Sequence, residues 1–400
     1  DLKADRYADA MERTYPVFAH GVDVFAATSG KMRGDAVTAV LDLPALRQDG
    51  TTRFAVQVAP SLAVATLDAL PYLVDFPYGC TEQTMSRFLP AVITAKTLRD
   101  QGLAAEDIAS RVFGGVERAT ADKTHSKSAG LARLDEVTKD ALARLADLQH
   151  ADGGFGWWKI GESDRFMTAY VVQGLTLAHE AGIAVDLDRL ANAAAFLDRN
   201  LVEEERRPDM QAWMLYALAT YADRVDGARA AEFAATAFDN LWAQHRELNA
   251  YTRSLFALAA QALGRRDEAR VLVDNLKNGV IRDEAPESSL VQRGTERTNA
   301  ATMPTAHWGE DGIRWRWSEG GVEATAWAIR ALLAVDPKHE LVEPAVNWLL
   351  RNRRGNQWSN TRDTALCVLA MNDYLRVSGE LGRSVGYRVR VNGSVVAERT

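Results

Sequence analysis

Early in its sequence the chain reads Pro77-Tyr78-Gly79-Cys80-Thr81-Glu82-Gln83-Thr84. A glycine, which readily adopts turn conformations, precedes a cysteine, and residues compatible with a helix follow. Cys80 and Gln83 are three residues apart, so one helical turn would bring both side chains to the same face. A cysteine thiolate is a strong nucleophile, and a side-chain amide is an acyl group that it can attack. The spacing therefore allows an internal thioester between Cys80 Sγ and Gln83 Cδ, formed with loss of ammonia.

The spacing alone also fits a plainer interpretation, in which Cys80 is a small buried residue beside the surface amide of Gln83. A thioester needs a dry, shielded pocket, because water would hydrolyse it, and the spacing does not reveal such a pocket. Two roles are open for Glu82. It could act as an acid or base on the departing ammonia, or it could stabilise the first helical turn through the helix dipole.

The longer string 77–90 resembles the thioester segment of the alpha-2-macroglobulin family, in its bacterial branch. The family signature, Cys-x-Glu-Gln, is matched by residues 80–83, and Tyr78 and Gly79 match the Tyr-Gly that precedes it in bacterial members. Animal members usually have glycine where Thr81 stands. The resemblance implies a thioester domain, which is the reactive module of much larger protease-trapping proteins.

The resemblance also implies the site. It assigns the internal thioester to Cys80 and Gln83, with Gly79, Glu82 and Tyr78 in supporting positions. It implies no metal ion and no cofactor, and the chain contains no Cys/His cluster with zinc spacing. Cys367, the second of the two cysteines, lies in an apolar run and is expected to be a buried core thiol.

The middle of the chain, about 61–378, has helical periodicity. Leu131, Leu134, Val137, Ala141 and Leu145 step by three or four residues, as on the apolar face of a helix. Similar runs lie near 90–102, 165–181, 186–201, 210–224, 228–245, 250–263, 266–277, 321–335, 341–352 and 361–377.

A weak internal repeat recurs in this middle part, where a loop containing Gly or Trp precedes a helix that opens with Thr and Ala. Its copies are 149–172, 315–328 and 355–369. The helical runs and the repeat predict a mainly α fold, an α/α toroid of about six helical hairpins. Alternating segments described below predict that β-sandwich-type segments flank it at both ends. The thioester domains of the resembled family have this toroid fold, so the two arguments agree.

Both ends of the chain are expected to form β-structure. Strand candidates with alternating apolar residues lie at 21–26, 36–44 and 53–58, and the cluster 48–50 marks a turn. Near the other end, Asn392-Gly393 is a strong signal for a two-residue hairpin. With the resemblance, these signals imply three parts. Residues 1–60 are β-segments of the CUB-like domain and of the domain before it, 61–378 are the helical thioester domain, and 379–400 are a truncated returning β-segment of the CUB-like domain. Both ends suggest a fragment of a longer protein.

In a toroid the loops at one end converge, so Trp157, Trp158 and Tyr170 are candidates for a shield that keeps water from Cys80. The plain alternative is that these rings plug the ends of helical hairpins. The stretch 152–165 contains no histidine. Certain complement components carry a histidine there that redirects acyl transfer to hydroxyls, so the resemblance implies a preference for amines.

Two other histidines bear on this question. His150 lies just before the histidine-free stretch and is expected to cap the end of a helix. A role for His307 stays open.

The composition excludes several functions. The net charge of −7 and the interspersed charges argue against nucleic-acid binding. No apolar run is long enough for a membrane span, and two cysteines exclude a disulfide scaffold.

By resemblance, the chain is part of a broad-spectrum protease inhibitor rather than an enzyme. A protease cleaves a bait region elsewhere, and a lysine amine of that protease then attacks the acyl group of Gln83. The expected partners are target proteases and the rest of a macroglobulin chain. The expected location is periplasmic or extracytoplasmic, with inner-membrane anchoring of the full-length protein as an option. Two alternatives remain: a toroid enzyme resembling terpene cyclases or prenyltransferases, and a helical interaction module with an inert Cys-Gln pair.

Overall fold

The structure is a computed structural model. It describes residues 2–4, 7–9, 12–13, 36–39, 43–48, 50–52, 54, 69–75, 79–100, 102, 127–225, 231–284, 286, 290–293, 304–309, 321–353, 357–378 and 386–399. The expected strands 21–26 and most of 53–58 lie outside these residues, as do Tyr78, Trp315 and Trp317.

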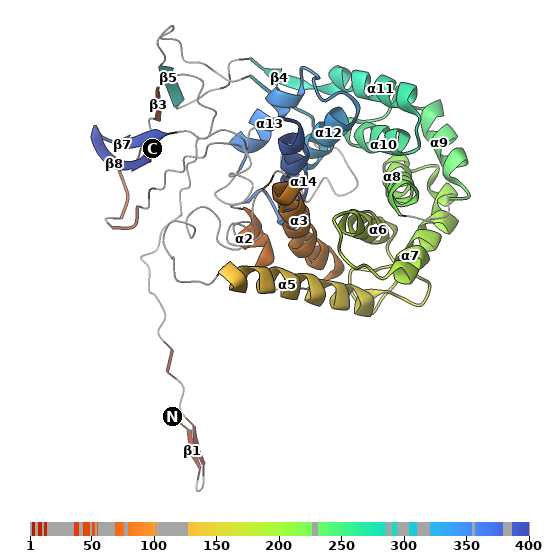
Figure 1. The fold of residues 1–400 in the computed structure, drawn as a ribbon, viewed down its shortest axis with the longest axis horizontal. Coiled ribbons are helices and arrows are strands. Elements are labelled where there is room, and N and C mark those ends of the chain that lie inside the picture. Colours follow the sequence, from red (N-terminus) through yellow and green to blue (C-terminus); the bar gives the residue numbers. More distant parts are fainter. Residues whose placement is uncertain are drawn as a thin grey trace.

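The helices form two concentric rings, seen end-on in Figure 1. The inner ring consists of α3 (Thr81–Asp100), α6 (Arg165–Glu180), α8 (Pro208–Arg224), α10 (Ala250–Ala262), α12 (Val322–Val335) and α14 (Thr361–Ser378). The outer ring consists of α2 (Ala69–Val74), α5 (Lys127–Leu148), α7 (Leu187–Asn200), α9 (Ala234–Ala243), α11 (Arg266–Asp274) and α13 (Val342–Arg351). Each inner helix packs against the next, and α14 packs against α3. This closed arrangement confirms the mainly α fold and the α/α toroid.

The ring closes where its first and last inner helices, α3 and α14, meet. Three side-chain hydrogen bonds cross this seam: Thr361 to Glu82 (3.1 Å), Asn372 to Thr94 (2.8 Å) and Arg376 to Thr97 (3.2 Å). The partners are 279, 278 and 279 residues apart in sequence. A constant separation means that the two helices run parallel and in register.

The Gly/Trp repeat has one recurring contact. In each of three loops, the backbone N–H of an aromatic residue donates to a threonine hydroxyl near the start of the following inner helix. The pairs are Phe155 with Thr168 (2.8 Å), Trp308 with Thr325 (3.2 Å) and Trp358 with Thr364 (3.0 Å). The expected threonines are therefore the common element. In the middle copy, Trp308 provides the aromatic partner within the described residues.

Helix α3 is longer at its start than the periodic run near 90–102 suggested. It begins at Thr81, continues through Pro90 and ends at Asp100. Proline lacks the N–H that an interior helical position uses, and its ring crowds the carbonyl four residues earlier. However, α3 is buried along most of its length, and packing of this extent outweighs a local preference.

The described strands are short and antiparallel. The pairs are β1 (Leu2–Ala4) with β2 (Tyr7–Asp9), β3 (Ala36–Ala39) with β5 (Leu290–Arg293), β4 (Ile281–Asp283) with β6 (Thr305–His307), and β7 (Tyr387–Val391) with β8 (Ser394–Arg399). Asn392 and Gly393 have positive φ angles of 48° and 86°, as the tight turn between β7 and β8 requires. This confirms the expected hairpin. Two short 3₁₀ helices, Val202–Glu204 and Asn275–Gly279, are the remaining elements within the described residues.

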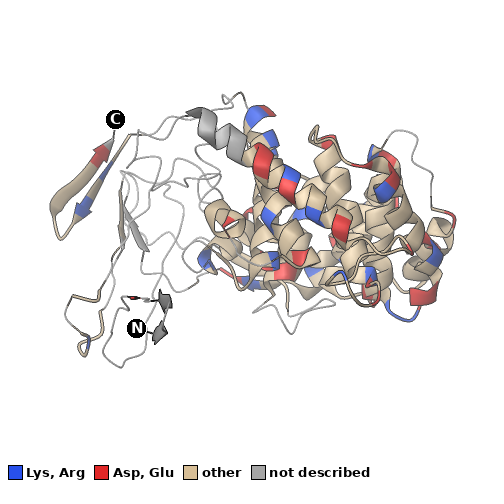
Figure 2. Cartoon of the chain, turned by 90° about the horizontal axis from the view of Figure 1, so that it is seen from below, with Lys and Arg blue, Asp and Glu red and all other residues tan. Residues whose placement is uncertain are grey.

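Positions of positive and negative residues are interspersed along the helices (Figure 2). Their mixture agrees with the modest net charge of −7. Among the described helices, none combines the length and the apolar character that a membrane span would need.

Candidate functional site

Cys80 and Gln83 meet at the start of α3 through two reciprocal hydrogen bonds. The backbone N–H of Gln83 points at Cys80 Sγ, 3.5 Å away, and the backbone N–H of Cys80 donates to Gln83 Oε1 at 3.3 Å. The same pattern forms a capping box when serine and glutamate occupy these positions. Here the two capping side chains are a nucleophile and an amide. The local geometry that starts the helix therefore brings the thiol and the acyl group together.

The turn that carries Cys80 is tied to the loop before α6 and to α5. Thr81 donates its backbone N–H to the carbonyl oxygen of Trp157 (3.1 Å) and its hydroxyl to that of Gly156 (2.6 Å). On the other side, Nε and Nη2 of Arg144 each donate to the carbonyl oxygen of Gly79 at 3.2 Å. The residues before and after Cys80 are thus fixed by separate elements.

Cys80 is almost inaccessible, with 4% of its surface exposed. Burial raises the pKa of the Cys80 thiol, and the nearby charge of Glu82 raises it further, against the lowering effect of the N–H groups around the sulfur. A buried thiol with a raised pKa stays protonated at neutral pH. Cys367 in α14 is also fully buried, and burial raises its pKa well above the usual range, which confirms it as a core thiol.

Glu82 is buried, and hydroxyl groups bind its carboxylate. Its carboxylate accepts hydrogen bonds from Ser86 Oγ (2.6 Å) and from Thr361 Oγ1 (3.1 Å and 3.2 Å to its two oxygens). Ser86 Oγ in turn lies 3.1 Å from the Tyr170 hydroxyl. Burial raises the pKa of Glu82, and these donors together with the charge of Arg362 only partly offset that effect. The contacts favour a structural role over direct action on the departing ammonia.

The three candidate shield residues differ in position. Trp157 is half-buried against the core, and its carbonyl oxygen holds Thr81. Tyr170 is buried, and burial, followed by the charge of Glu82, raises its pKa. Trp158 is 56% exposed. Trp157 and Tyr170 are therefore joined to the turn at Cys80 directly or through Ser86, whereas most of the Trp158 side chain faces solvent.

His150 does not cap α5, so that expectation is wrong. Its ring nitrogens lie 3.0 Å from Ser163 Oγ and 3.1 Å from the carbonyl oxygen of Trp158. It therefore joins the two ends of the loop before α6. His307 in β6 stacks on Trp348 at 4.5 Å between ring centroids, and burial lowers its pKa.

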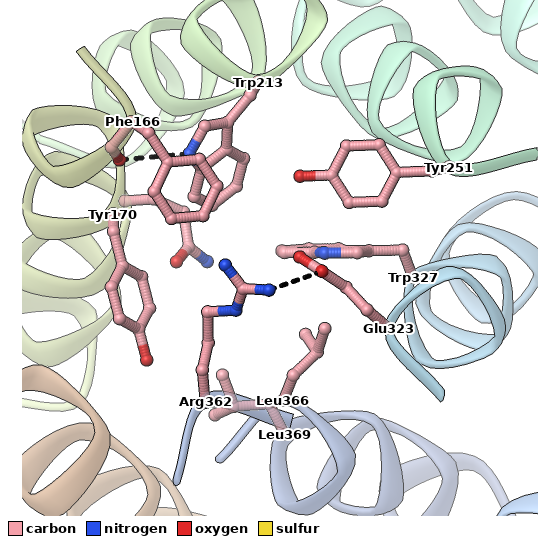
Figure 3. Close-up of a pocket in the computed structure, with 10 residues that line it drawn as sticks. Phe166, Tyr170, Trp213, Tyr251, Glu323, Trp327, Arg362, Leu366 and Leu369 are labelled. Carbon is pink, nitrogen blue, oxygen red and sulfur yellow. Dashed lines mark hydrogen bonds and ion pairs between the residues drawn. The ribbon is translucent and has the colours of Figure 1, made fainter. Parts of the chain in front are cut away.

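The centre of the toroid contains a small cavity that is partly open to solvent. Arg362 and Glu323 point toward one another across it and form an ion pair of 2.7 Å (Figure 3). The Arg362 guanidinium also lies 5.2 Å from the centroid of the Phe166 ring, and Trp213 meets Trp327 edge-on at 5.3 Å. The ion pair between Arg362 and Glu323 thus lies among aromatic side chains, near the start of α14.

Several residues around the reactive turn were not expected from the sequence. Arg144, Ser86 and Thr361 approach it from other helical turns, and for Thr361 the separation from Glu82 is 279 residues. A serine four residues after Glu82 was the one local signal available, because such residues share a helix face. Among the described residues, no group of three or more potential ligands could hold a metal ion.

A family model described as the A-macroglobulin TED domain matches residues 55–204. The "Alpha-2-macroglobulin" of Thermotoga maritima is 34% identical over 160 residues, which are 40% of this chain and 8% of that protein. The "Alpha-2-macroglobulin" of Escherichia coli is 31% identical over 120 residues, which are 30% of this chain and 6% of that protein. The match thus spans less than a tenth of the length of these relatives.

Two solved structures are similar in fold. Native alpha-2-macroglobulin of Escherichia coli, from domain MG7 to the C-terminus, has a TM-score of 0.50 at 17% identity, covering 77% of this chain and 42% of that chain. Salmonella alpha-2-macroglobulin reacted with methylamine has a TM-score of 0.51 at 18% identity, covering 78% and 18%. The family match and the relatives confirm the resemblance drawn from residues 77–90, and they do not favour the two alternatives.

Proposed function

We propose a function from the premise that residues 55–204 belong to the A-macroglobulin TED domain family. In this proposal the chain carries an internal thioester between Cys80 and Gln83, and it transfers the acyl group of Gln83 to an amine. The observation that carries the proposal is the reciprocal pair of hydrogen bonds between these two residues. The finer steps below follow from the chemistry of that pair.

Bond formation exchanges nitrogen for sulfur at one carbon. Cys80 Sγ attacks Gln83 Cδ, the Cδ–N bond breaks, and the thiol proton leaves with the nitrogen as ammonia. Charge develops on Gln83 Oε1 in the tetrahedral intermediate. The Cys80 N–H already donates to that oxygen at 3.3 Å, so it is aimed at the atom that becomes the oxyanion.

In acyl transfer, the sulfur of Cys80 changes from nucleophile to leaving group. An amine nitrogen attacks Gln83 Cδ, the Cδ–S bond breaks, and one amine proton passes to the departing sulfur. The product is an amide at Gln83 and a free thiol at Cys80. The chain is used once, because nothing in this sequence of steps regenerates the thioester.

Burial supports a latent bond. A thiolate whose conjugate thiol has a raised pKa is a poorer leaving group, and burial raises the pKa of Cys80. The bond should therefore react slowly while the turn is covered. Exposure of the turn would lower this pKa, admit the amine and speed the transfer.

The biological use follows by analogy with the family. We propose that the amine is a lysine of a protease that has cleaved a bait region elsewhere in a longer parent chain. The absence of histidine from 152–165 supports amines over hydroxyls as acceptors. The parent would then be a covalent, broad-spectrum protease inhibitor, acting in the periplasm or another extracytoplasmic compartment. Target proteases and the rest of the parent chain are its proposed partners.

Intact-mass measurement tests the thioester. Freshly purified chain should be lighter than its sequence by one ammonia, and methylamine should add one methylamine and release one thiol. The Salmonella relative is described as reacted with methylamine, which supports this probe. Cys80→Ala and Gln83→Ala should have the mass of their sequences and ignore methylamine. Cys367→Ala is the matched control and should keep the bond, because Cys367 is buried in α14. An unmodified mass that methylamine leaves unchanged would overturn the proposal.

A further inference from the structure

We infer that Thr361, at the start of the last inner helix, is a positioning residue for the bond between Cys80 and Gln83. The inference rests on the proposed function, and it adds α14 to the site. Thr361 lies far from the reactive pair in sequence, and neither the motif nor the family match, which ends at residue 204, includes it.

The contact that carries the inference is buried and shared between two carboxylate oxygens. Thr361 Oγ1 lies 3.1 Å and 3.2 Å from the two oxygens of Glu82. Both side chains are 8% exposed. A buried carboxylate needs hydrogen-bond donors, and the two described here come from Ser86, on the same helix, and from Thr361. Thr361 therefore provides the donor that fixes the carboxylate, and with it the first turn of α3, to another helix.

Arg362 does not take this role, although it is the next residue along the chain. Its guanidinium points into the central cavity, where it pairs with Glu323 (Figure 3). Its charge lowers the pKa of Glu82 only as a minor influence beside burial. Direct contact with Glu82 thus comes from Thr361, while Arg362 is held elsewhere.

Among the described residues, three separate elements hold the reactive turn. Arg144 of α5 holds Gly79, the loop before α6 holds Thr81, and Thr361 of α14 holds Glu82. Glu82 is the neighbour of Gln83, so the rotation of the first helical turn sets where the Gln83 amide lies relative to Cys80 Sγ. Loss of the attachment at Glu82 would let that turn rotate and separate the two groups.

The experiment compares three variants of the full chain with wild type. Thr361→Val removes the hydroxyl and keeps the shape, and Thr361→Ser restores the hydroxyl. Thr94→Val is the matched control, because it removes a hydroxyl from the same α3–α14 seam, where Thr94 accepts from Asn372 at 2.8 Å. Intact mass gives the ratio of bonded to open chains, and urea unfolding gives the stability of each variant.

We expect Thr361→Val to lower the ratio of bonded to open chains by about tenfold, the effect of losing one hydrogen bond to a charged group. Thr361→Ser and Thr94→Val should stay close to wild type in this ratio, although Thr94→Val should unfold at lower urea concentration. An unchanged ratio in Thr361→Val would overturn the inference, as would an equal fall in Thr94→Val, which would trace the effect to stability alone.

A second measurement separates this inference from the proposed function. If wild type contains no bonded chains, the thioester proposal fails, and alkylation of the open Cys80 thiol by iodoacetamide then tests the positioning role directly. Thr361→Val should be alkylated at Cys80 about tenfold faster than wild type and Thr94→Val. Peptide mapping distinguishes Cys80 from Cys367. Equal alkylation rates would show that Thr361 does not hold the turn.

Discussion

Asn372 of α14 donates its side-chain amide to Thr94 Oγ1 of α3 at 2.8 Å, and both residues are buried. This bond lies in the middle of the seam that closes the inner ring. Replacing Asn372 with alanine would leave Thr94 without this donor and remove packed atoms, so we expect the free energy of unfolding to fall by about 2–3 kcal/mol. Urea unfolding measures it.

Asn352 provides the control for this prediction. Its side-chain amide donates to the backbone carbonyl of Trp348 at 2.9 Å, at an exposed helix end. Asn352→Ala should cost less than about 1 kcal/mol, because water can replace the lost partner. Equal losses in the two variants would contradict a special contribution from the seam.

Alanine substitutions at Gly153 and Gly182 distinguish the cost of a steric conflict from the cost of backbone strain. Their φ angles are almost equal, 91° and 87°, but a Cβ at Gly153 would lie 2.5 Å from the carbonyl oxygen of Asn192, whereas a Cβ at Gly182 meets nothing within 4 Å. Gly182→Ala should cost about 1–2 kcal/mol from strain alone. Gly153→Ala should cost clearly more, because the loop before α6 must also move. Comparison of melting temperatures checks the order, and a Gly153 variant no less stable than the Gly182 variant would refute it.

Trp157 and Trp158 are neighbours whose exposure predicts different effects on the proposed thioester. Trp157→Ala should raise the rate of reaction with methylamine, because this half-buried ring packs against the core and belongs to the loop that holds Thr81. Trp158→Ala should leave the rate within about twofold of wild type, since this ring is 56% exposed. Release of thiol over time measures both rates. A larger effect of Trp158 would mean that its ring covers Cys80 despite this exposure.

Glu82→Gln should change how stability depends on pH. Burial raises the pKa of Glu82 above its ordinary value of 4.5, so the folded chain keeps this proton when the unfolded chain has lost it. The wild type therefore loses stability as pH rises above 4.5 through the folded pKa, and no further loss from Glu82 occurs beyond it. Glutamine does not titrate, so Glu82→Gln should lack this loss of stability. The free energy of unfolding of the variant should therefore rise relative to that of wild type as pH increases across this window.

Urea unfolding at a series of pH values measures this difference. The charged or titratable neighbours of Glu82 are Arg362, which stays charged, and Tyr72, Tyr170 and Cys80, whose pKa values are all raised and which stay neutral across the window. A difference between wild type and variant that is constant with pH would show that Glu82 titrates at its ordinary value in the folded chain.

Local physics made much of the fold predictable. The helical period identified most of the helices, although α2 lay in none of the predicted runs, and Asn392-Gly393 identified a hairpin because both residues tolerate positive φ. The spacing of Cys80 and Gln83 indicated that one helical turn could join them, and the structure has both in the capping positions of α3. Each of these features depends on residues close in sequence.

The remaining features depend on tertiary contacts. The periodic run near 90–102 did not extend before Pro90, but the packing of α3 carries the helix through it. His150 follows α5 closely enough to cap it, yet its ring meets Ser163 and the carbonyl oxygen of Trp158 across a folded loop. Thr361 has no local mark of its role, because its partner Glu82 is 279 residues away.

The parallel register of α3 and α14 also has a mechanical consequence. The chain enters α3 at Thr81 and leaves α14 at Ser378, and in parallel helices these points lie at opposite ends of the contact. Tension between the flanking segments therefore slides the two helices past each other instead of peeling them apart. Under such shear the three bonds of the seam bear the load together, and the one nearest Cys80 is the bond between Thr361 and Glu82. A pull on the ends of the toroid would thus reach the reactive turn without passing through the other inner helices.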